Sequence, residues 1–116
     1  MSAYLAYLDS AIAQLTEQAA MLKATGREDE AALCRIETNI DDICRTIYHV
    51  CKRTAAPADF RALYLQKLDR LPQGREQSRA LAAAHGDSCK AVIEEIKLKT
   101  LAHNRVQFLE LDGKEA

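Results

Sequence analysis

The sequence has few residues that interrupt helices and no excess of charge of either sign. It contains two prolines, four glycines and no tryptophan among 116 residues, and its 16 Lys and Arg are matched by 17 Asp and Glu. General nucleic-acid binding needs a clear basic excess for the phosphates, and a polybasic membrane anchor needs one for anionic lipids. We therefore expect neither nucleic acid nor a membrane surface as a partner.

Long apolar runs are also missing. No stretch reaches the roughly 18 uninterrupted apolar residues of a membrane-spanning helix. Residues 1–15 carry Asp9 within their apolar stretch and have no basic leader, so we expect no signal peptide there. This indicates a cytoplasmic protein, whose cysteines would be reduced thiols rather than disulfides; they are Cys34, Cys44, Cys51 and Cys89.

Composition and length indicate one folded helical domain. Hydrophobic residues make up 48% and charged residues 28% of the chain, which is typical of a folded protein. Alanine and leucine, both strong helix formers, are abundant. We expect a single helical domain over residues 1–111 and a frayed tail over residues 112–116.

Two long segments repeat apolar residues every three or four positions, which predicts amphipathic helices. The first stripe is Leu5, Leu8, Ile12, Leu15, Ala19 and Leu22. The second is Leu33, Ile36, Ile40, Ile43, Ile47 and Val50, on a helix expected to end near Thr54. Gly26 lies between the two segments and can adopt the left-handed conformation that ends a helix. In the second helix we expect Ile40, Ile43 and Ile47 to be nearly inaccessible.

The rest of the chain predicts a broken third arm and a long last helix. The third arm begins around Pro57 and is stopped or kinked at Pro72–Gly74 before helix resumes from Arg75 to Ala84. Gly86 is expected to end this arm, and Asp87 or Ser88 to cap a last helix that runs to about Leu111.

Matched arm lengths then predict the architecture. Three helices of roughly 24 to 27 residues would each be about 36 to 40 Å long, and the broken arm is similar. We expect an all-α, antiparallel up-down-up-down helical bundle with its third arm broken at Pro72–Gly74. The alternative treats Pro72–Gly74 and Gly86 as full reversals, which gives five helices in successive hairpins.

Known catalytic patterns are missing. The residues three positions before the histidines are Thr46, Ala82 and Thr100, so the Glu-x-x-His pair of di-iron bundles does not occur. There is no glycine-rich phosphate loop and no nucleophile elbow. We expect the outer helix faces to carry the carboxylates Glu37, Asp41, Asp42, Glu94 and Glu95, and the bundle rims to carry the tyrosines Tyr4, Tyr7, Tyr48 and Tyr64. The sequence therefore predicts no enzyme activity.

The cysteines suggest an alternative function. Cys44 and Cys51 share a helix face, Cys89 lies on the expected core stripe of the last helix, and His85 precedes it by one turn. Three thiols and an imidazole can form a tetrahedral zinc site, so one hypothesis is a thiol- or zinc-dependent regulatory module built on Cys44, Cys51, Cys89 and His85. A buried cysteine also serves as a small hydrophobic residue, and no C-x-x-C pair occurs. We therefore expect no metal and no cofactor, and we expect Cys34 to face solvent.

The last helix is apolar on two faces. Cys89, Val92, Ile93 and Ile96 make one stripe, which we expect in the core. A second set lies roughly 160° around the helix. We expect this set to be a partner surface, which two copies would share in a homodimer; it is formed by Leu98, Leu101, Phe108 and Leu109. Such a bundle is similar in shape to small helical secretion chaperones, without a shared motif. The expected function is protein–protein interaction, adaptor or chaperone-like, with self-association.

Overall fold

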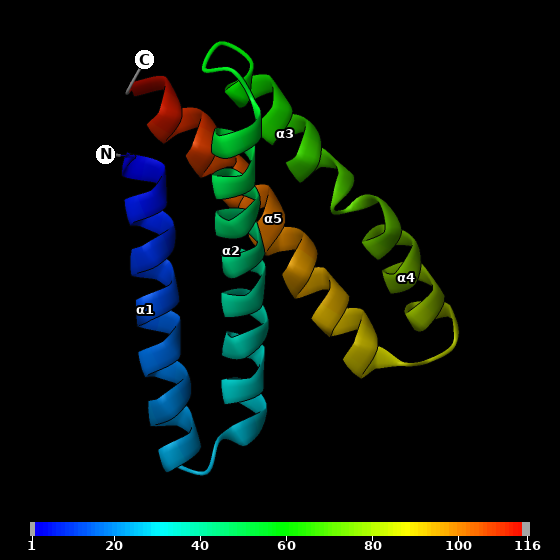
Figure 1. Ribbon diagram of the computed structural model, residues 1–116. Helices are drawn as coiled ribbons and strands as arrows, with labels where there is room; N and C mark the ends of the chain where they lie inside the picture. The colour runs from blue at the N-terminus through cyan, green and yellow to red at the C-terminus, as the bar shows by residue number, and fades with distance from the viewer. Residues whose placement is uncertain (1, 115–116) are drawn as a thin grey trace.

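The structure, a computed structural model, describes residues 2–114 and is helical almost throughout (Figure 1). Its elements are α1 (Ala3–Ala24), α2 (Glu28–Thr54), α3 (Phe60–Arg70), α4 (Gln73–Ala84) and α5 (Ser88–Lys114). No strand occurs among the described residues. The all-α prediction is confirmed.

The turns at Gly26 and Gly86 have the same design. Both glycines adopt positive φ, 80° and 76°, which a residue with a Cβ atom rarely adopts. In each turn the following amide reaches back to close the helix: Arg27 N–H donates to the Leu22 carbonyl at 2.8 Å. Asp87 then caps α5, because its carboxylate accepts from Lys90 N–H at 3.0 Å. These predicted helix ends are confirmed.

The third arm is one bent rod. Leu71 and Pro72, between α3 and α4, keep helical backbone angles, so the chain kinks there without reversing. Figure 1 shows α3 and α4 descending together beside α5. The prediction of a broken third arm is therefore confirmed. The alternative, in which the chain reverses at Pro72–Gly74, is wrong.

Two helix boundaries in the structure differ from the predicted ones. α3 begins at Phe60 rather than near Pro57. α5 continues to Lys114, so residues 112–114 are helical where we expected fraying. The last two residues of the expected tail, 115–116, lie outside the described part of the chain.

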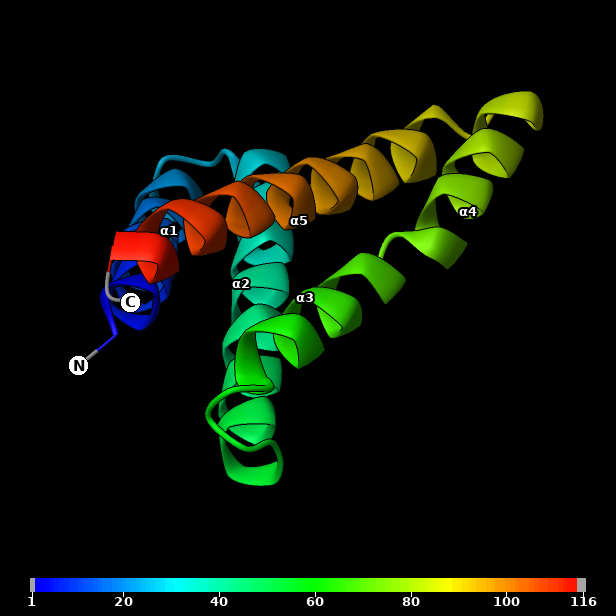
Figure 2. The ribbon, with the colours of Figure 1, turned by 90° about the horizontal axis from the view of Figure 1, so that it is seen from above.

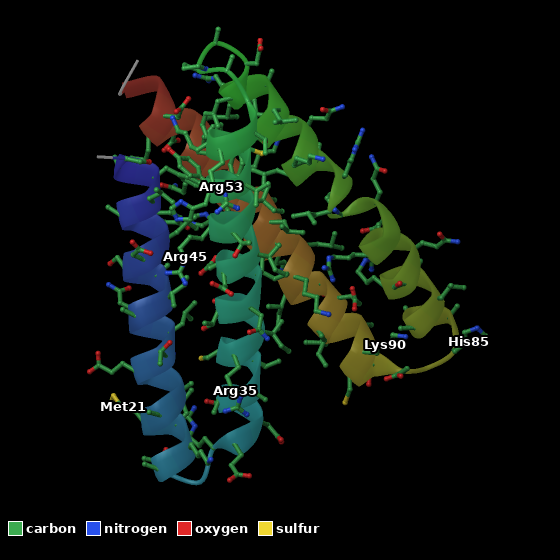
Figure 3. The ribbon with its side chains drawn as sticks, in the orientation of Figure 1. Met21, Arg35, Arg45, Arg53, His85 and Lys90 are labelled. Carbon is green, nitrogen blue, oxygen red and sulfur yellow. The ribbon has the colours of Figure 1, made fainter. Side chains whose placement is uncertain are left out.

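The arms form two hairpins that meet at one end and diverge at the other. One hairpin is α1 with α2, and the other is the bent arm α3–α4 with α5. α5 crosses α2 obliquely, and its C-terminal end lies near the start of α1 (Figures 1 and 2). Met21 and His85 mark the two tips of this fork, far from one another (Figure 3). The molecule measures 45 × 34 × 21 Å, so it is about two helix diameters thick.

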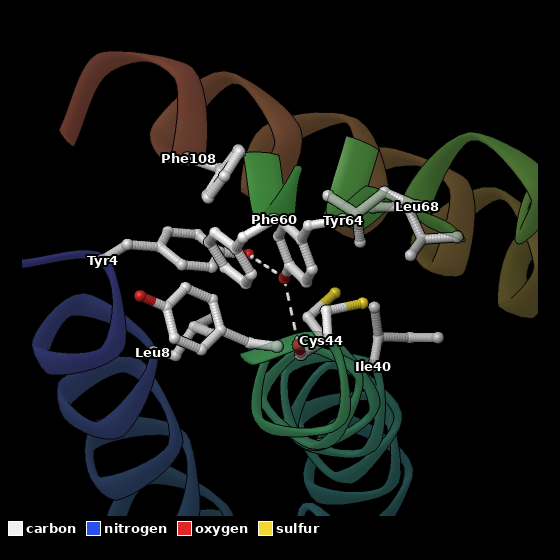
Figure 4. Close-up of a cluster of buried hydrophobic side chains, with 11 residues drawn as sticks. Tyr4, Leu8, Ile40, Cys44, Phe60, Tyr64, Leu68 and Phe108 are labelled. Atoms are coloured by element: carbon white, nitrogen blue, oxygen red, sulfur yellow. Dashed lines mark hydrogen bonds between the residues drawn. The ribbon is translucent and has the colours of Figure 1, made fainter. Parts of the chain in front are cut away.

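The core lies at the joined end and is aromatic (Figure 4). The rings of Tyr64 and Phe108 are 4.6 Å apart between centroids, and those of Tyr48 and Phe60 are 4.8 Å apart. Tyr4 and Tyr64 are fully buried, and their hydroxyl oxygens are 2.7 Å apart. Tyr64 donates to the Cys44 carbonyl at 3.0 Å, which leaves Tyr4 to donate to Tyr64. The prediction of rim positions is wrong for Tyr4, Tyr48 and Tyr64, because all three side chains are buried in the core. The hydroxyls of Tyr4 and Tyr64 find their partners there.

Near the α1–α2 turn the packing uses small side chains. Ala19, Ala31 and Cys34 are buried there, with Leu15 and Leu22 packed against them. Cys34 was expected to face solvent, and that prediction is wrong. The residue lies on the side of α2 that faces α1.

The buried face of α2 is rotated from the isoleucine stripe by about one residue. Its buried positions are Ala31, Cys34, Ile40, Asp41, Cys44, Tyr48 and Cys51. Ile40 is nearly inaccessible as predicted, but Ile43 and Ile47 are only partly buried. The reason is that α2 packs against α1, α3 and α5, so a broad sector of it is covered.

Within the described part of the chain, none of the helices is long and apolar enough to cross a membrane.

Candidate functional site

The expected partner surface on α5 is not a free surface in the structure. Leu101 and Phe108 are buried in the chain's own aromatic core, while Leu98 and Leu109 are partly buried. The joined end of the fork covers the face of α5 that carries Leu101 and Phe108, so these two residues belong to the chain's own core.

The face that was expected in the core is the more open one. Cys89 is exposed, Val92 has 47% of its surface exposed, and Ile93 and Ile96 are only partly buried. These residues lie on the first half of α5, where the helix has diverged from the α1–α2 hairpin (Figure 1). The apolar surface of α5 that a partner could reach is therefore Cys89, Val92, Ile93 and Ile96, called here the α5 stripe.

The candidate zinc ligands are not brought together. Cys44 and Cys51 are buried in the core, whereas Cys89 is exposed in the first turn of α5. His85 is exposed at the end of α4 (Figure 3). Among the residues that the structure describes, no group of three or more His, Cys, Asp or Glu side chains could hold a metal ion. Burial raises the pKa of the Cys44 thiol to about 11, which disfavours the thiolate that binds metals and attacks electrophiles.

A buried polar cluster joins α1, α2 and α5 where the fork opens. Asn104 donates to the Asp41 carboxylate at 2.8 Å and contacts the Cys44 sulfur at 3.5 Å. Tyr7 donates its hydroxyl to the Asn104 side-chain oxygen at 3.1 Å. Asp41 is only 3% exposed, so its predicted position on an outer face is wrong. Glu94 is also buried and also contradicts that prediction; it pairs with Lys97 at 3.3 Å.

Sequence spacing contains a signal for Asp41 that the isoleucine pattern obscured. Positions 34, 41, 44, 48 and 51 follow the same three-and-four spacing as the isoleucines, and in the structure they form the buried stripe. A stripe of cysteine, tyrosine and aspartate resembles a hydrophobic core less than a row of isoleucines does.

Burial dominates the electrostatics of this cluster. It raises the pKa of Asp41, and the nearby Glu37 raises it further, while the hydrogen bond from Asn104 and the proximity of His103 oppose the shift. Burial, with a smaller contribution from the Asp41 charge, raises the pKa of Tyr7 to about 12. Tyr7 is therefore a neutral hydrogen-bond donor at physiological pH.

The cluster forms the wall of an open hollow of about 410 Å³ between α1, α2 and α5. Its polar lining includes Gln14 and Gln18 from α1, Glu37 and Asp41 from α2, and His103 and Asn104 from α5. A larger hollow of about 660 Å³ lies between α1 and α2 and is lined by alanines, Ile36 and polar residues that are exposed or partly buried. Only the smaller hollow contains buried polar side chains, so it is the better candidate for specific recognition.

No protein-family model matches this sequence, and no curated protein or solved structure shows significant similarity to it. The fold, the α5 stripe and the polar hollow are therefore the basis for assigning a function.

Proposed function

We propose that the protein acts by binding another protein along the α5 stripe, in an adaptor or chaperone-like role, and that it self-associates through the same face. The observation that carries the proposal is the openness of the fold. The radius of gyration is 15.7 Å, whereas a compact domain of this length has about 13.4 Å. The chain thus leaves its two hairpins spread apart.

The surface area supports the same proposal. The accessible surface is 7184 Å², against about 6300 Å² expected for a folded monomer of this mass. The excess, about 900 Å², is close to the roughly 800 Å² that one partner buries in a standard protein–protein interface.

The α5 stripe is suited to a helical partner. Its residues follow the three-and-four spacing with which one helix packs on another. Leu81, on the neighbouring α4, is 53% exposed and adds apolar surface on the same hairpin. Recognition of an amphipathic helix by an apolar groove or face is a common mode of binding.

The test compares two valines on α5 that are equally exposed. Val92 lies on the stripe and is 47% exposed, while Val106 lies elsewhere on the helix and is 49% exposed. Val92→Glu should weaken self-association at least tenfold in sedimentation equilibrium, whereas Val106→Glu should leave it unchanged. Proteins captured from an extract of the native cells should follow the same pattern.

Equal effects of the two substitutions would contradict the proposal, and so would a parent protein that stays monomeric and captures nothing that Val92→Glu loses. Because both valines are exposed, neither variant should unfold, and circular dichroism checks this.

A further inference from the structure

We propose that the polar hollow between α1, α2 and α5 receives the guanidinium group of an arginine side chain supplied by the partner protein. This inference rests on the proposed function for the existence of a partner. It adds the chemistry that the partner must carry and the place where that chemistry binds.

The hollow holds two carboxylates that form no ion pair with a basic side chain among the described residues. Glu37 and Asp41 are one helical turn apart on α2 and both line the hollow. Neither has a basic ion-pair partner within the described residues, whereas the other buried carboxylate, Glu94, pairs with Lys97. A cation that entered the hollow would meet two carboxylates, one of them almost completely buried.

The lysine at the edge of the hollow does not fill this role. Lys99 pairs with Glu95 at 3.0 Å, and its side chain is 75% exposed. The other basic group of the lining, His103, is exposed on α5. Its proximity lowers the pKa of Asp41, but the two side chains form no ion pair in the described part of the chain. Both groups lie toward solvent, whereas Asp41 is buried beneath them.

The geometry of the lining favours arginine. A guanidinium group is planar, is always charged and carries five N–H donors that can contact several acceptors at once. Here the acceptors are the carboxylates of Asp41 and Glu37 and the amide oxygens of Gln14 and Gln18. Such charge-assisted hydrogen bonds are stronger than hydrogen bonds between neutral groups, and the difference grows where water is partly excluded. Ala11, Leu15 and the Tyr7 ring give apolar surface for the aliphatic stem.

The hollow continues the α5 stripe. From Ile93 and Ile96, the same face of α5 leads to Thr100 and His103, which line the hollow. Ile93 and Thr100 are separated by about two turns, or roughly 10 Å along the helix. A partner helix that packs on the stripe would therefore place an arginine in the hollow about two turns from its apolar residues.

The experiment uses the full-length protein and a probe without any partner. N-acetyl-arginine methylamide is titrated into isotope-labelled protein, and N-acetyl-citrulline methylamide serves as an uncharged probe of the same shape. We expect saturable NMR shifts of the Asn104 side-chain amide and of the amides at Glu37, Asp41 and Thr100 with the arginine probe. The citrulline probe should bind at least tenfold more weakly.

Variants then locate the site. Asp41→Asn and Glu37→Gln should each weaken arginine binding at least about tenfold, because each removes a charged acceptor while keeping the side-chain shape. Glu17→Gln, at an exposed position on α1, makes the same change in net charge and should have no effect. Glu37 is only partly buried, so Glu37→Gln remains informative if Asp41→Asn alters the fold.

Several results would overturn the arginine site. They are shifts that do not saturate, equal binding of citrulline, equally tight binding of N-acetyl-lysine methylamide, or binding that is indifferent to both variants. The comparison of Val92→Glu with Val106→Glu uses no arginine probe, so a failure of the arginine site is distinguishable from a failure of the proposed function.

Discussion

The two ends of the fork are built from different side chains. At the joined end, five aromatic residues interlock, and Tyr4, Tyr64 and Phe108 are fully buried. At the diverging end, α1 and α2 are held together by Ala19, Ala31 and Cys34, and α4 buries only Ala82. Aromatic side chains each bury about 150 to 250 Å², far more than alanine can. The comparison teaches that the joined end carries most of the stability, while the diverging end contributes little to it.

The largest expected effect comes from removing an aromatic ring at the joined end. Phe108→Ala should cost about 3 to 5 kcal/mol of unfolding free energy, because the side chain is fully buried and its loss leaves a cavity. Leu81→Ala, at the diverging end, should change stability by less than about 0.5 kcal/mol. Urea unfolding of both variants checks this, and equal costs would mean that stability is spread evenly over the two ends.

A smaller change at the joined end removes one hydroxyl. Tyr64→Phe should cost about 1 to 3 kcal/mol, because Tyr64 donates to the Cys44 carbonyl and accepts from Tyr4, which would lose its partner inside the core. Denaturant midpoints give the cost. Tyr7→Phe is the matched control, since Tyr7 is only partly buried, and it should cost less. The reverse order would place the important polar contacts at the opening of the fork.

Much of the fold follows from local sequence. Helix ends at Gly26, Gly86 and Asp87 depend on residues within one or two turns, so caps and charges predict them well. The kink at Pro72 is local too, because proline removes a backbone donor. These features do not require knowledge of which helix packs on which.

The site was harder to predict because it depends on packing between distant helices. α5 carries two apolar faces, and nothing within α5 indicates that the Phe108 side meets Tyr4, more than a hundred positions earlier in the chain. The same holds for Asp41, which is buried because Asn104 and Tyr7 are brought to it from α5 and α1. Periodicity identifies the faces of a helix, but the tertiary arrangement decides which face is covered.

The turns offer a finer test at the diverging end. Gly86→Ala should destabilise the protein by about 1 kcal/mol, because φ is 76° there and a Cβ atom is disfavoured whatever the surrounding space. Gly74→Ala is the control: Gly74 is helical, nothing lies within 4 Å of an added Cβ, and the substitution should stabilise α4 by roughly 0.5 to 1 kcal/mol. Thermal unfolding gives the sign of each change. Two changes of the same sign would contradict the assigned turn.

The smallest expected effect lies where the two ends meet, at Asp41. Burial raises the pKa of this carboxyl in the folded state, so below the ordinary pKa of aspartate, about 3.9, both folded and unfolded chains hold the proton. As the pH rises above that value, the unfolded chain loses the proton first, and the stabilisation from protonated Asp41 is lost as the pH passes the folded-state pKa. The titratable groups that interact with Asp41 are Tyr4, Tyr7, Glu37, Cys44 and His103. They are present in both parent and variant.

Asp41→Asn keeps a neutral group that can still accept from Asn104, so its stability relative to the parent should increase from pH 4 to pH 7. Urea unfolding at both pH values measures this, with the exposed Glu17→Gln as the control for net charge. If the difference between Asp41→Asn and the parent stayed constant over this range, Asp41 would be solvated, and the hollow would lose the buried charge on which arginine recognition depends.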